Sequence, residues 1–293
     1  MRIIVPSAPG GGYDFTGRLL AERLSQELGQ PFIVENRVGG GTVLGTQTAA
    51  AAGADGYTLV MGGLANMAFN LAMHKDLRYH PVRDFTPVAM VGAFTYALVG
   101  RKDLPASDMR ALIDYARANP GKLTIATSGV GTGQHVSALL LSRFASVDLL
   151  VVNYKGAQPA YADLLPGRVD LFFDNTTTAR PFIADGRVKA FVTSGPVRDT
   201  LLPDVPTAAE AGMPEFVLDS WMGLFAPAKT PPAVIERLRA ATVKAVDHPD
   251  TRRRLEANGW RIMVMPADET RAFVRREAEK WPALLRQAGL QPE

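Results

Sequence analysis

Short apolar runs alternate along the chain with segments whose apolar residues recur at helical spacing. Repeated alternation of this kind is typical of parallel sheets that helices cover on both faces, so the pattern predicts an α/β fold. The runs expected to form buried strands are 3–5, 32–34, 58–61, 123–126, 149–152, 169–173 and 190–193. The expected helices lie near residues 14–28, 42–52, 107–118, 132–145, 157–165 and 176–185.

Two extended apolar segments, 93–101 and 219–227, interrupt this alternation. A chain that leaves one lobe through the first and returns through the second forms a two-strand hinge, and the sequence alone permits this geometry without requiring it. Pro231 and Pro232 then open another helix. Near the C-terminus a helical stripe runs over residues 270–288, and Pro282 is expected to break or kink it.

Composition narrows the class of protein. A chain of 293 residues can bury a large core and favours two lobes over one domain. The net charge of +3 is spread along the chain, and the one basic run, Arg252–Arg254, is expected to be a solvated helix face, which argues against nucleic-acid binding. The absence of cysteine excludes disulfides and thiol catalysis and argues against a structural zinc site.

No apolar run reaches the roughly 18 residues that a membrane span needs. The first predicted core strand begins at residue 3, which leaves no room for a signal peptide.

The first candidate site is a glycine turn between the opening strand and its helix. Such a turn presents backbone N–H groups, and the helix that follows adds the positive end of its dipole, which suits an anion. Asp14 is interpreted as the N-cap, and the backbone of Gly10 to Tyr13 as the ligand contact. Tyr13 either lies against a ligand or fills the mouth of the site. The residues of this candidate are Pro9, Gly10, Gly11, Gly12, Tyr13 and Asp14.

Three further candidates follow other predicted strands. Ala65 and Asn66 come after the strand at 58–61, where Asn66 caps a helix or donates to a ligand oxygen. The glycine-rich loop after the strand at 123–126 places hydroxyl donors at a helix start. The last group follows the strands at 149–152 and 169–173. The candidate residues of these two regions are Ser128, Gly131 and Thr132, then Tyr154, Asp174, Asn175 and Thr176.

The four loops 9–14, 62–66, 128–135 and 174–178 contain neither Arg nor Lys, so neutral donors and helix dipoles would hold an anion. They also lack a paired acid and base, which counts against catalysis. We expect no metal and no cofactor. The competing interpretation is an α/β domain whose turns simply use Gly, Ser, Asn and Thr, and the residues alone leave both interpretations open.

The chain resembles a known family through an ordered set of short motifs. The motifs are Val34–Arg37 with Gly39–Gly41, Asp55–Leu59, Asp84–Val88, Ser128–Thr132, Tyr154–Gly156, Pro206–Thr207 with Glu210–Gly212, and Ala226–Ala228. This order is similar to that of the substrate-binding proteins of tripartite tricarboxylate transporters, the Bug family. The resemblance covers essentially the whole chain.

The resemblance implies a two-lobed periplasmic binding protein of the type II kind, in which each lobe is a mainly parallel sheet flanked by helices. The expected lobes are 1–97 with 224–293, and 98–223. The implied function is that of a monomeric receptor, not an enzyme, which binds a small di- or tricarboxylate in the interlobe cleft and delivers it to a membrane permease. A periplasmic location implies that a leader was removed.

The family leaves the ligand open among malate, succinate, citrate, adipate, aspartate, glutamate and terephthalate. The alternative to a receptor is a cytoplasmic α/β enzyme that acts on a phosphorylated or carboxylate substrate through the glycine-rich loops.

Overall fold

The computed structural model describes residues 1–288 and residue 290, and these residues form two compact units. Unit 1 contains residues 1–93 and the chain from residue 221 onward, and unit 2 contains residues 94–220. The sequence predicts the two crossings near residues 97 and 223.

Unit 1 is built on a six-stranded sheet with the strand order β11-β4-β10-β3-β1-β2. Strands β1, β2 and β3 are parallel to one another, while β10 is antiparallel to β3 and β11 to β4. The strands are β1 Arg2–Val5, β2 Ile33–Asn36, β3 Thr58–Gly63, β4 Phe85–Phe94, β10 Ser220–Pro227 and β11 Arg261–Ile262.

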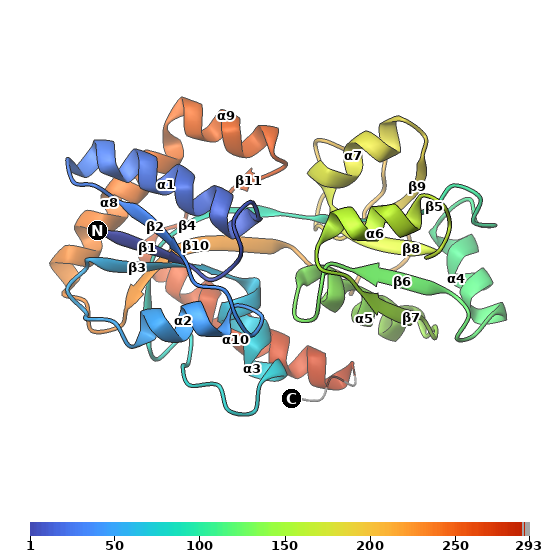
Figure 1. Cartoon of the computed structure of the whole chain (residues 1–293), viewed down its shortest axis with the longest axis horizontal. Coiled ribbons are helices and arrows are strands. Elements are labelled where there is room, and N and C mark those ends of the chain that lie inside the picture. Colours follow the sequence, from blue (N-terminus) through green and yellow to red (C-terminus); the bar gives the residue numbers. More distant parts are fainter. Residues whose placement is uncertain (289, 291–293) are drawn as a thin grey trace. The chain divides into compact units, whose positions relative to one another are not determined.

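Helices cover both faces of this sheet (Figure 1), with α1, α8 and α9 on one face and α2, α3 and α10 on the other. They are α1 Gly12–Leu28, α2 Val43–Ala50, the π-helix η1 Ala65–Phe69, α3 Asn70–Met73, α8 Pro232–Asp247, α9 Pro249–Ala257 and α10 Ala267–Gln287.

Unit 2 repeats the arrangement with a five-stranded sheet of order β7-β6-β8-β5-β9. Strands β6, β7 and β8 are parallel, and β5 is antiparallel to both β8 and β9. Both sheets are therefore mixed. The elements are β5 Tyr96–Arg101, α4 Met109–Ala118, β6 Thr124–Thr127, α5 Gly133–Ala145, β7 Leu150–Asn153, α6 Ala157–Leu164, β8 Leu171–Asn175, α7 Thr176–Ala184 and β9 Val188–Thr193.

In unit 1 the antiparallel strand β10 lies next to β3, and in unit 2 the antiparallel strand β5 lies next to β8. Both strands belong to segments that cross between the units. β4 leads through Thr95 directly into β5, and β10 begins where the chain returns to unit 1. The sequence predicts that these segments are extended and apolar. They are core strands, since every residue of β10 is buried.

The local signals explain where the first elements begin and end. Ile3, Ile4 and Val5 are fully buried in β1, and Leu20 and Leu24 lie on the buried face of α1. Gly29 ends that helix in the left-handed conformation, at φ 63°, as the sequence predicts.

The break expected at Pro282 does not occur, because α10 continues to Gln287. Proline in a helix interior costs about 3 kcal/mol, but Trp281 and Leu285 on either side of it are buried against unit 1. Tertiary packing therefore outweighs the local signal.

No helix in the described residues is long and apolar enough to cross a membrane.

Candidate functional site

The carboxyl ends of parallel strands lie at one edge of a sheet, and the loops that follow them gather there. In unit 1 these are the loops after β1, β2 and β3, and in unit 2 the loops after β6, β7 and β8. All candidate residues from the sequence lie in or beside these loops, so each unit contributes one candidate edge.

The opening loop of unit 1 is organised by Asp14, which is not the N-cap that the sequence suggested. Gly11 is the N-cap, α1 begins at Gly12, and Asp14 lies in its first turn. The Asp14 carboxylate accepts hydrogen bonds from Gly10 N–H at 3.0 Å, from Arg18 Nε at 2.9 Å and from Asn36 Nδ2 at 2.9 Å. The side chain therefore ties the glycine turn to α1 and β2.

These bonds set the charge of the loop. Burial alone would raise the pKa of Asp14, but the hydrogen bonds from Arg18, Gly10 and Asn36 outweigh it and hold the pKa below its ordinary value of 3.8. Gly10 N–H is used within the loop, which removes it from the expected ligand contacts. The N–H groups of the first helical residues, beginning at Gly12, remain the donors that a helix start offers to an anion. Pro9 and Gly11 are exposed.

Asn66 is fully buried and serves the structure of unit 1. Its Oδ1 accepts from the Tyr13 hydroxyl at 3.0 Å and from Gly63 N–H at 2.8 Å. Its Nδ2 donates to Thr46 Oγ1 at 2.9 Å and to Met61 O at 3.2 Å. Since both amide hydrogens are engaged, Asn66 orients Tyr13 and does not donate to a ligand in this state. Ala65, half-buried at the start of η1, stays a predicted contact.

In unit 2, Thr132 is the N-cap of α5, and its hydroxyl is used inside its own loop. Oγ1 donates to Gly129 O at 2.7 Å and accepts from His135 N–H at 3.2 Å. In this conformation the hydroxyl is engaged within its loop, and a direct contact of Thr132 with a ligand stays a prediction. Gly129 at φ 128° and Gly131 at φ 80° supply the left-handed backbone that the turn needs.

Ser128, directly before this turn, behaves differently. Its Oγ is buried and has no hydrogen-bond partner in the described part of the chain. A buried polar group without a partner costs about 1–3 kcal/mol. Such groups are the exceptions for which a bound water or ligand is the usual explanation. Ser128 therefore stays a predicted ligand contact, with a hydroxyl that no described residue engages.

Asp174 and Asn175 end β8, and Thr176 begins α7. Asp174 is 1% exposed, and burial raises the pKa of its carboxyl group to about 7. Among the described residues, Asp174 Oδ2 and Asn175 Oδ1 are buried atoms without a hydrogen-bond partner. Thr176 is almost fully buried as well. This end of β8 thus combines buried acceptors with an acid that titrates near neutral pH.

Tyr154 does not present a free phenol. Its hydroxyl donates to Asp163 Oδ2 at 2.8 Å, and Asp163 also forms an ion pair with Arg168. Burial, and then the neighbouring Asp163, raise the pKa of Tyr154 to about 12. The side chain therefore joins the loop after β7 to α6, and the predicted ligand contact through its hydroxyl is not available in this state.

Sequence reasoning missed the buried polar residues behind the loops. Thr46, Asn70 and Tyr79 lie under the unit 1 edge, and Tyr96 and Tyr161 lie beside Asp174 in unit 2. A polar residue within a helix pattern is normally assigned to the solvated face, so periodicity alone does not single these residues out. The spacing of Asn66 and Asn70, four residues apart, was the one available signal.

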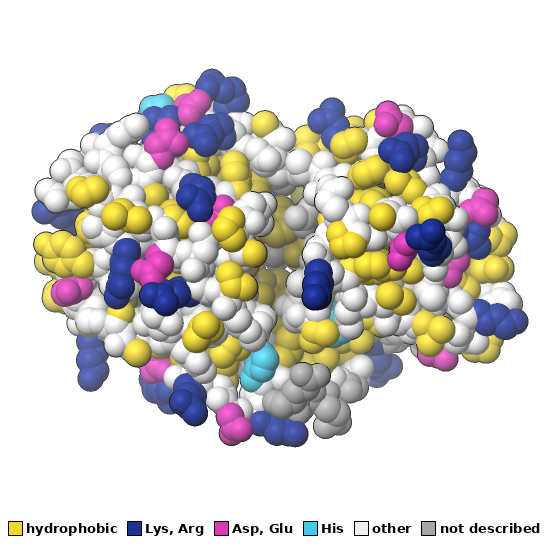
Figure 2. Space-filling model, viewed as in Figure 1, with side chains coloured by type: hydrophobic (Ala, Val, Ile, Leu, Met, Phe, Trp, Pro, Cys, Tyr) yellow, Lys and Arg dark blue, Asp and Glu magenta, His cyan; other side chains and the backbone are white. Residues whose placement is uncertain are grey.

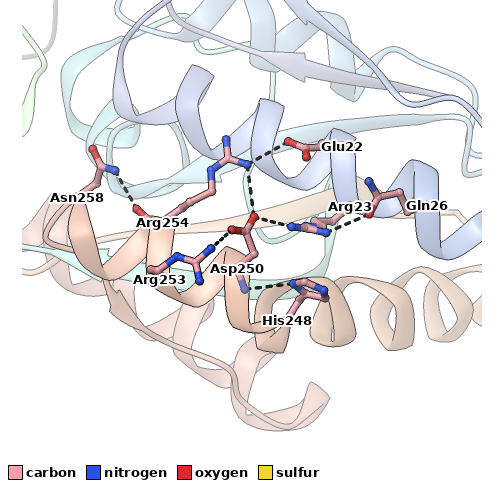
Figure 3. Close-up of polar contacts among 8 residues, drawn as sticks. All are labelled: Glu22, Arg23, Gln26, His248, Asp250, Arg253, Arg254 and Asn258. Atoms are coloured by element: carbon pink, nitrogen blue, oxygen red, sulfur yellow. Dashed lines mark hydrogen bonds and ion pairs between the residues drawn. The ribbon is translucent and has the colours of Figure 1, made fainter.

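The basic run on α9 is neutralised by carboxylates rather than presented as a patch (Figure 3). Arg253 pairs with Asp250, which Arg23 of α1 also contacts, and Arg254 pairs with Glu22 of α1. On the face shown in Figure 2, basic and acidic side chains are interspersed over the surface. The ion pairs agree with the expectation that this run is a solvated helix face.

No group of three or more His, Asp or Glu side chains within residues 1–288 and 290 is arranged to hold a metal ion.

Residues 16–290 match the tripartite tricarboxylate transporter family receptor. The chain belongs to this family. The protein BugT of Bordetella pertussis is 34% identical over 290 residues, which cover 99% of this chain and 89% of BugT. The resemblance inferred from the motifs is thereby confirmed.

Two solved structures are similar to this chain along almost its whole length. MatC from Rhodopseudomonas palustris, with bound malate, is 36% identical with a TM-score of 0.85, and the match covers 97% of this chain and 98% of MatC. A second R. palustris protein, solved with adipate, is 30% identical with a TM-score of 0.89 and coverage of 100% and 98%. The predicted periplasmic binding protein fold is confirmed, and the family is one of solute receptors rather than enzymes.

Proposed function

We propose that this protein is a periplasmic receptor that binds a small di- or tricarboxylate through the carboxyl-edge loops of its two units and delivers it to the permease of a tripartite transporter. The observation that carries the proposal is the pair of glycine turns that start α1 and α5, one in each unit. Each turn offers N–H groups and the positive end of a helix dipole to one carboxylate.

The electrostatics of the loops support an anionic ligand. Arg18 compensates the charge of Asp14, so the opening loop does not repel a carboxylate. Arg37 and Lys155 lie in the loops after β2 and β7, but the loops 9–14, 62–66, 128–135 and 174–178 carry neither Arg nor Lys, so we propose that neutral donors hold the anion. Hydrogen bonds to a charged acceptor are worth about 1.5–3 kcal/mol each, which suits a ligand that must be released again.

Relatives solved with malate and adipate make aliphatic dicarboxylates the first ligands to test. Succinate, citrate, aspartate, glutamate and terephthalate complete the set. We propose that the receptor acts as a monomer without catalytic turnover.

A thermal-shift screen of these acids, followed by isothermal titration, tests the proposal. A ligand that binds only the folded state raises the melting temperature by mass action. The dimethyl ester of the same acid must bind poorly, since it lacks the charge that the helix starts favour. If no carboxylate binds, or if the ester binds equally well, the proposed function is wrong, and formation of a product detected by mass spectrometry would contradict the receptor role.

Ser128→Ala is expected to weaken carboxylate binding by about ten- to a hundredfold, because one charge-assisted hydrogen bond is lost. The melting temperature of the free protein should not fall, since Ser128 Oγ has no internal partner among the described residues. Ser137→Ala is the matched control, because Ser137 Oγ is equally buried and unpartnered but lies inside α5. Titration calorimetry that shows equal affinity for both variants would remove Ser128 from the site.

Thr132→Val is expected to lower stability first. It deletes the N-cap of α5, which costs about 1 kcal/mol, and it frees Gly129 O from its hydrogen bond. Loss of the cap disorders the turn before α5, and weaker carboxylate binding follows from that disorder. The free energy of unfolding measured with denaturant and the affinity measured by titration should therefore fall together. A loss of affinity with unchanged stability would show that the Thr132 hydroxyl contacts the ligand directly.

A further inference from the structure

A closed ring of hydrogen bonds lies beneath the unit 1 edge, between the loops and the core. Asn66 Nδ2 donates to Thr46 Oγ1 at 2.9 Å, and Thr46 Oγ1 donates to Thr42 O at 2.9 Å. On the other side, Asn70 Nδ2 donates to Thr42 Oγ1 and to the Tyr79 hydroxyl, both at 3.1 Å. The Tyr79 hydroxyl closes the ring by donating to Asn66 O at 2.6 Å.

Most of the ring is buried, with Thr42 half-buried at its outer side, and the ring joins three loops. Thr46 and Asn66 are fully buried, and Asn70 and Tyr79 are 1% and 2% exposed. Thr42 belongs to the loop after β2, and Asn66 and Asn70 belong to the helical segment after β3. Through Asn66 Oδ1 the ring also holds the hydroxyl of Tyr13, in the first turn of α1.

Thr42 is held in a strained conformation at this point. Its φ of 83° lies in the left-handed region, which costs a β-branched residue on the order of 1–2 kcal/mol. Gly39, Gly40 and Gly41, directly before it, also have positive φ, which glycine adopts readily. Backbone strain of this kind persists only where the surroundings enforce it, and it is found preferentially at functional sites.

Asn70 supplies the enforcing contacts. The amide has two hydrogens: one donates to the Tyr79 hydroxyl, and the other is shared between Thr42 Oγ1 at 3.1 Å and Gly41 O at 3.3 Å, so it holds both the side chain and the backbone of the loop end. Asn66 and Asn70 lie four residues apart, at the start and the end of the turn formed by η1. A π-helix is rare and often marks a functional site.

We propose that Asn70 is a positioning residue that clamps the loop 39–42 in its left-handed conformation and, through the ring, couples this loop to the hydroxyl of Tyr13. The loops after β1 and β2 then respond as one body when a ligand binds at the unit 1 edge. This inference rests on the proposed function for its consequence in binding, but the coupling itself is a property of the free protein.

The coupling follows from the bonds. Without the Asn70 amide, Thr42 relaxes out of the left-handed region. Thr46 N–H and Thr46 Oγ1 both bond to Thr42 O, so the first turn of α2 moves with it. Asn66 then loses its Thr46 partner, and the Tyr13 hydroxyl loses a fixed acceptor.

The first experiment needs no ligand. Hydrogen–deuterium exchange of Asn70→Ala should rise both in residues 39–46 and in residues 10–16, although the side-chain amide that the substitution removes donates to the first segment and to Tyr79 and not to residues 10–16. Thr242→Val is the control, because it removes a fully buried hydroxyl bond within α8 of the same unit. If exchange rises only in residues 39–46, the coupling does not exist.

Asn70 is buried, so its replacement by alanine can prevent folding. Tyr79→Phe is the second variant, to be used if Asn70→Ala does not fold. It deletes only the hydroxyl that links Asn70 to Asn66 O and should raise exchange in the same two segments. Unchanged exchange in residues 10–16 of this variant overturns the inference equally.

The second experiment is rescue. Asn70→Ala is expected to lower affinity for malate or adipate about tenfold, and Thr42→Gly in that background should restore most of it, because glycine adopts the left-handed conformation without a clamp. A merely structural role of Asn70 would not be repaired at position 42, so absence of rescue contradicts the proposal. Failure of the parent protein to bind any carboxylate refutes the proposed function alone, because the exchange experiment decides the coupling.

Discussion

Asp174→Asn is expected to gain stability relative to the parent protein when the pH is raised from 4 to 8. Burial raises the pKa of Asp174 from 3.8 to about 7, so the folded protein holds a proton that the unfolded chain releases above pH 4. Stability of the parent therefore falls as the pH rises from about 4 to about 7 and stays lowered above that. At about 1.4 kcal/mol for each pKa unit, the difference is on the order of 4 kcal/mol.

The neutral amide of the variant removes this pH dependence. The free energy of unfolding of the variant minus that of the parent should thus increase by several kcal/mol between pH 4 and pH 8. Any packing cost of the amide is present at both pH values and cancels. The neighbouring Tyr96 and Tyr161 do not titrate in this range, because burial raises the pKa of each phenol.

Urea unfolding at several pH values provides the measurement. Asp163→Asn is the control with the opposite sign, since the hydrogen bond from Arg168 and that from Tyr154 lower the pKa of Asp163. The parent gains this stabilisation as the pH rises through the lowered pKa of Asp163 to about 4, so the deficit of the variant should be complete and constant above pH 4 and should shrink as the pH falls below 4. A difference for Asp174→Asn that does not vary with pH would mean that the acid is ionised in the folded protein throughout.

The sequence predicts the parallel part of each sheet because each strand and its helix are specified locally. Ile3 to Val5, the glycine turn and the stripe of α1 follow one another within 28 residues. The strands β4, β5 and β10 have no such local signature, since their neighbours in the sheet are far away in the chain. Their pairing depends on long-range contacts that a pattern of apolar residues does not encode.

The candidate loops do lie at strand ends, but the sequence does not reveal which of their side chains already have partners within the protein. Thr132 and Tyr154 were selected as donors because of residue type, whereas each hydroxyl finds a partner close in sequence, Gly129 and Asp163. Short-range bonds of this kind compete with any ligand. Ser128, of the same chemical type, lacks a partner among the described residues. Only coordinates separate the two situations.

Gly45→Ala is expected to be strongly destabilising, although helix propensity predicts the reverse. Gly45 lies inside α2, where alanine is favoured over glycine by about 1 kcal/mol. A Cβ atom at this position would lie 2.7 Å from Arg37 O, 2.7 Å from Pro6 Cα and 2.9 Å from Pro6 Cβ. Two of these atoms belong to the backbone, so no change of rotamer relieves the contact and α2 must move. Overpacking of this kind costs about 1–3 kcal/mol or more, which outweighs the propensity gain.

The displacement also reaches the proposed site, because Pro6 begins the loop after β1 and Arg37 the loop after β2. Thermal unfolding of Gly45→Ala should show a melting temperature several degrees below that of the parent, and affinity for a carboxylate should fall with it. Gly53→Ala is the control, since a Cβ there meets its nearest atom, Asp55 Oδ2, at 3.6 Å, an ordinary contact. If Gly45→Ala instead raises the melting temperature, α2 does not pack against these two loops as closely as the structure indicates, and helix propensity alone decides the stability of this segment.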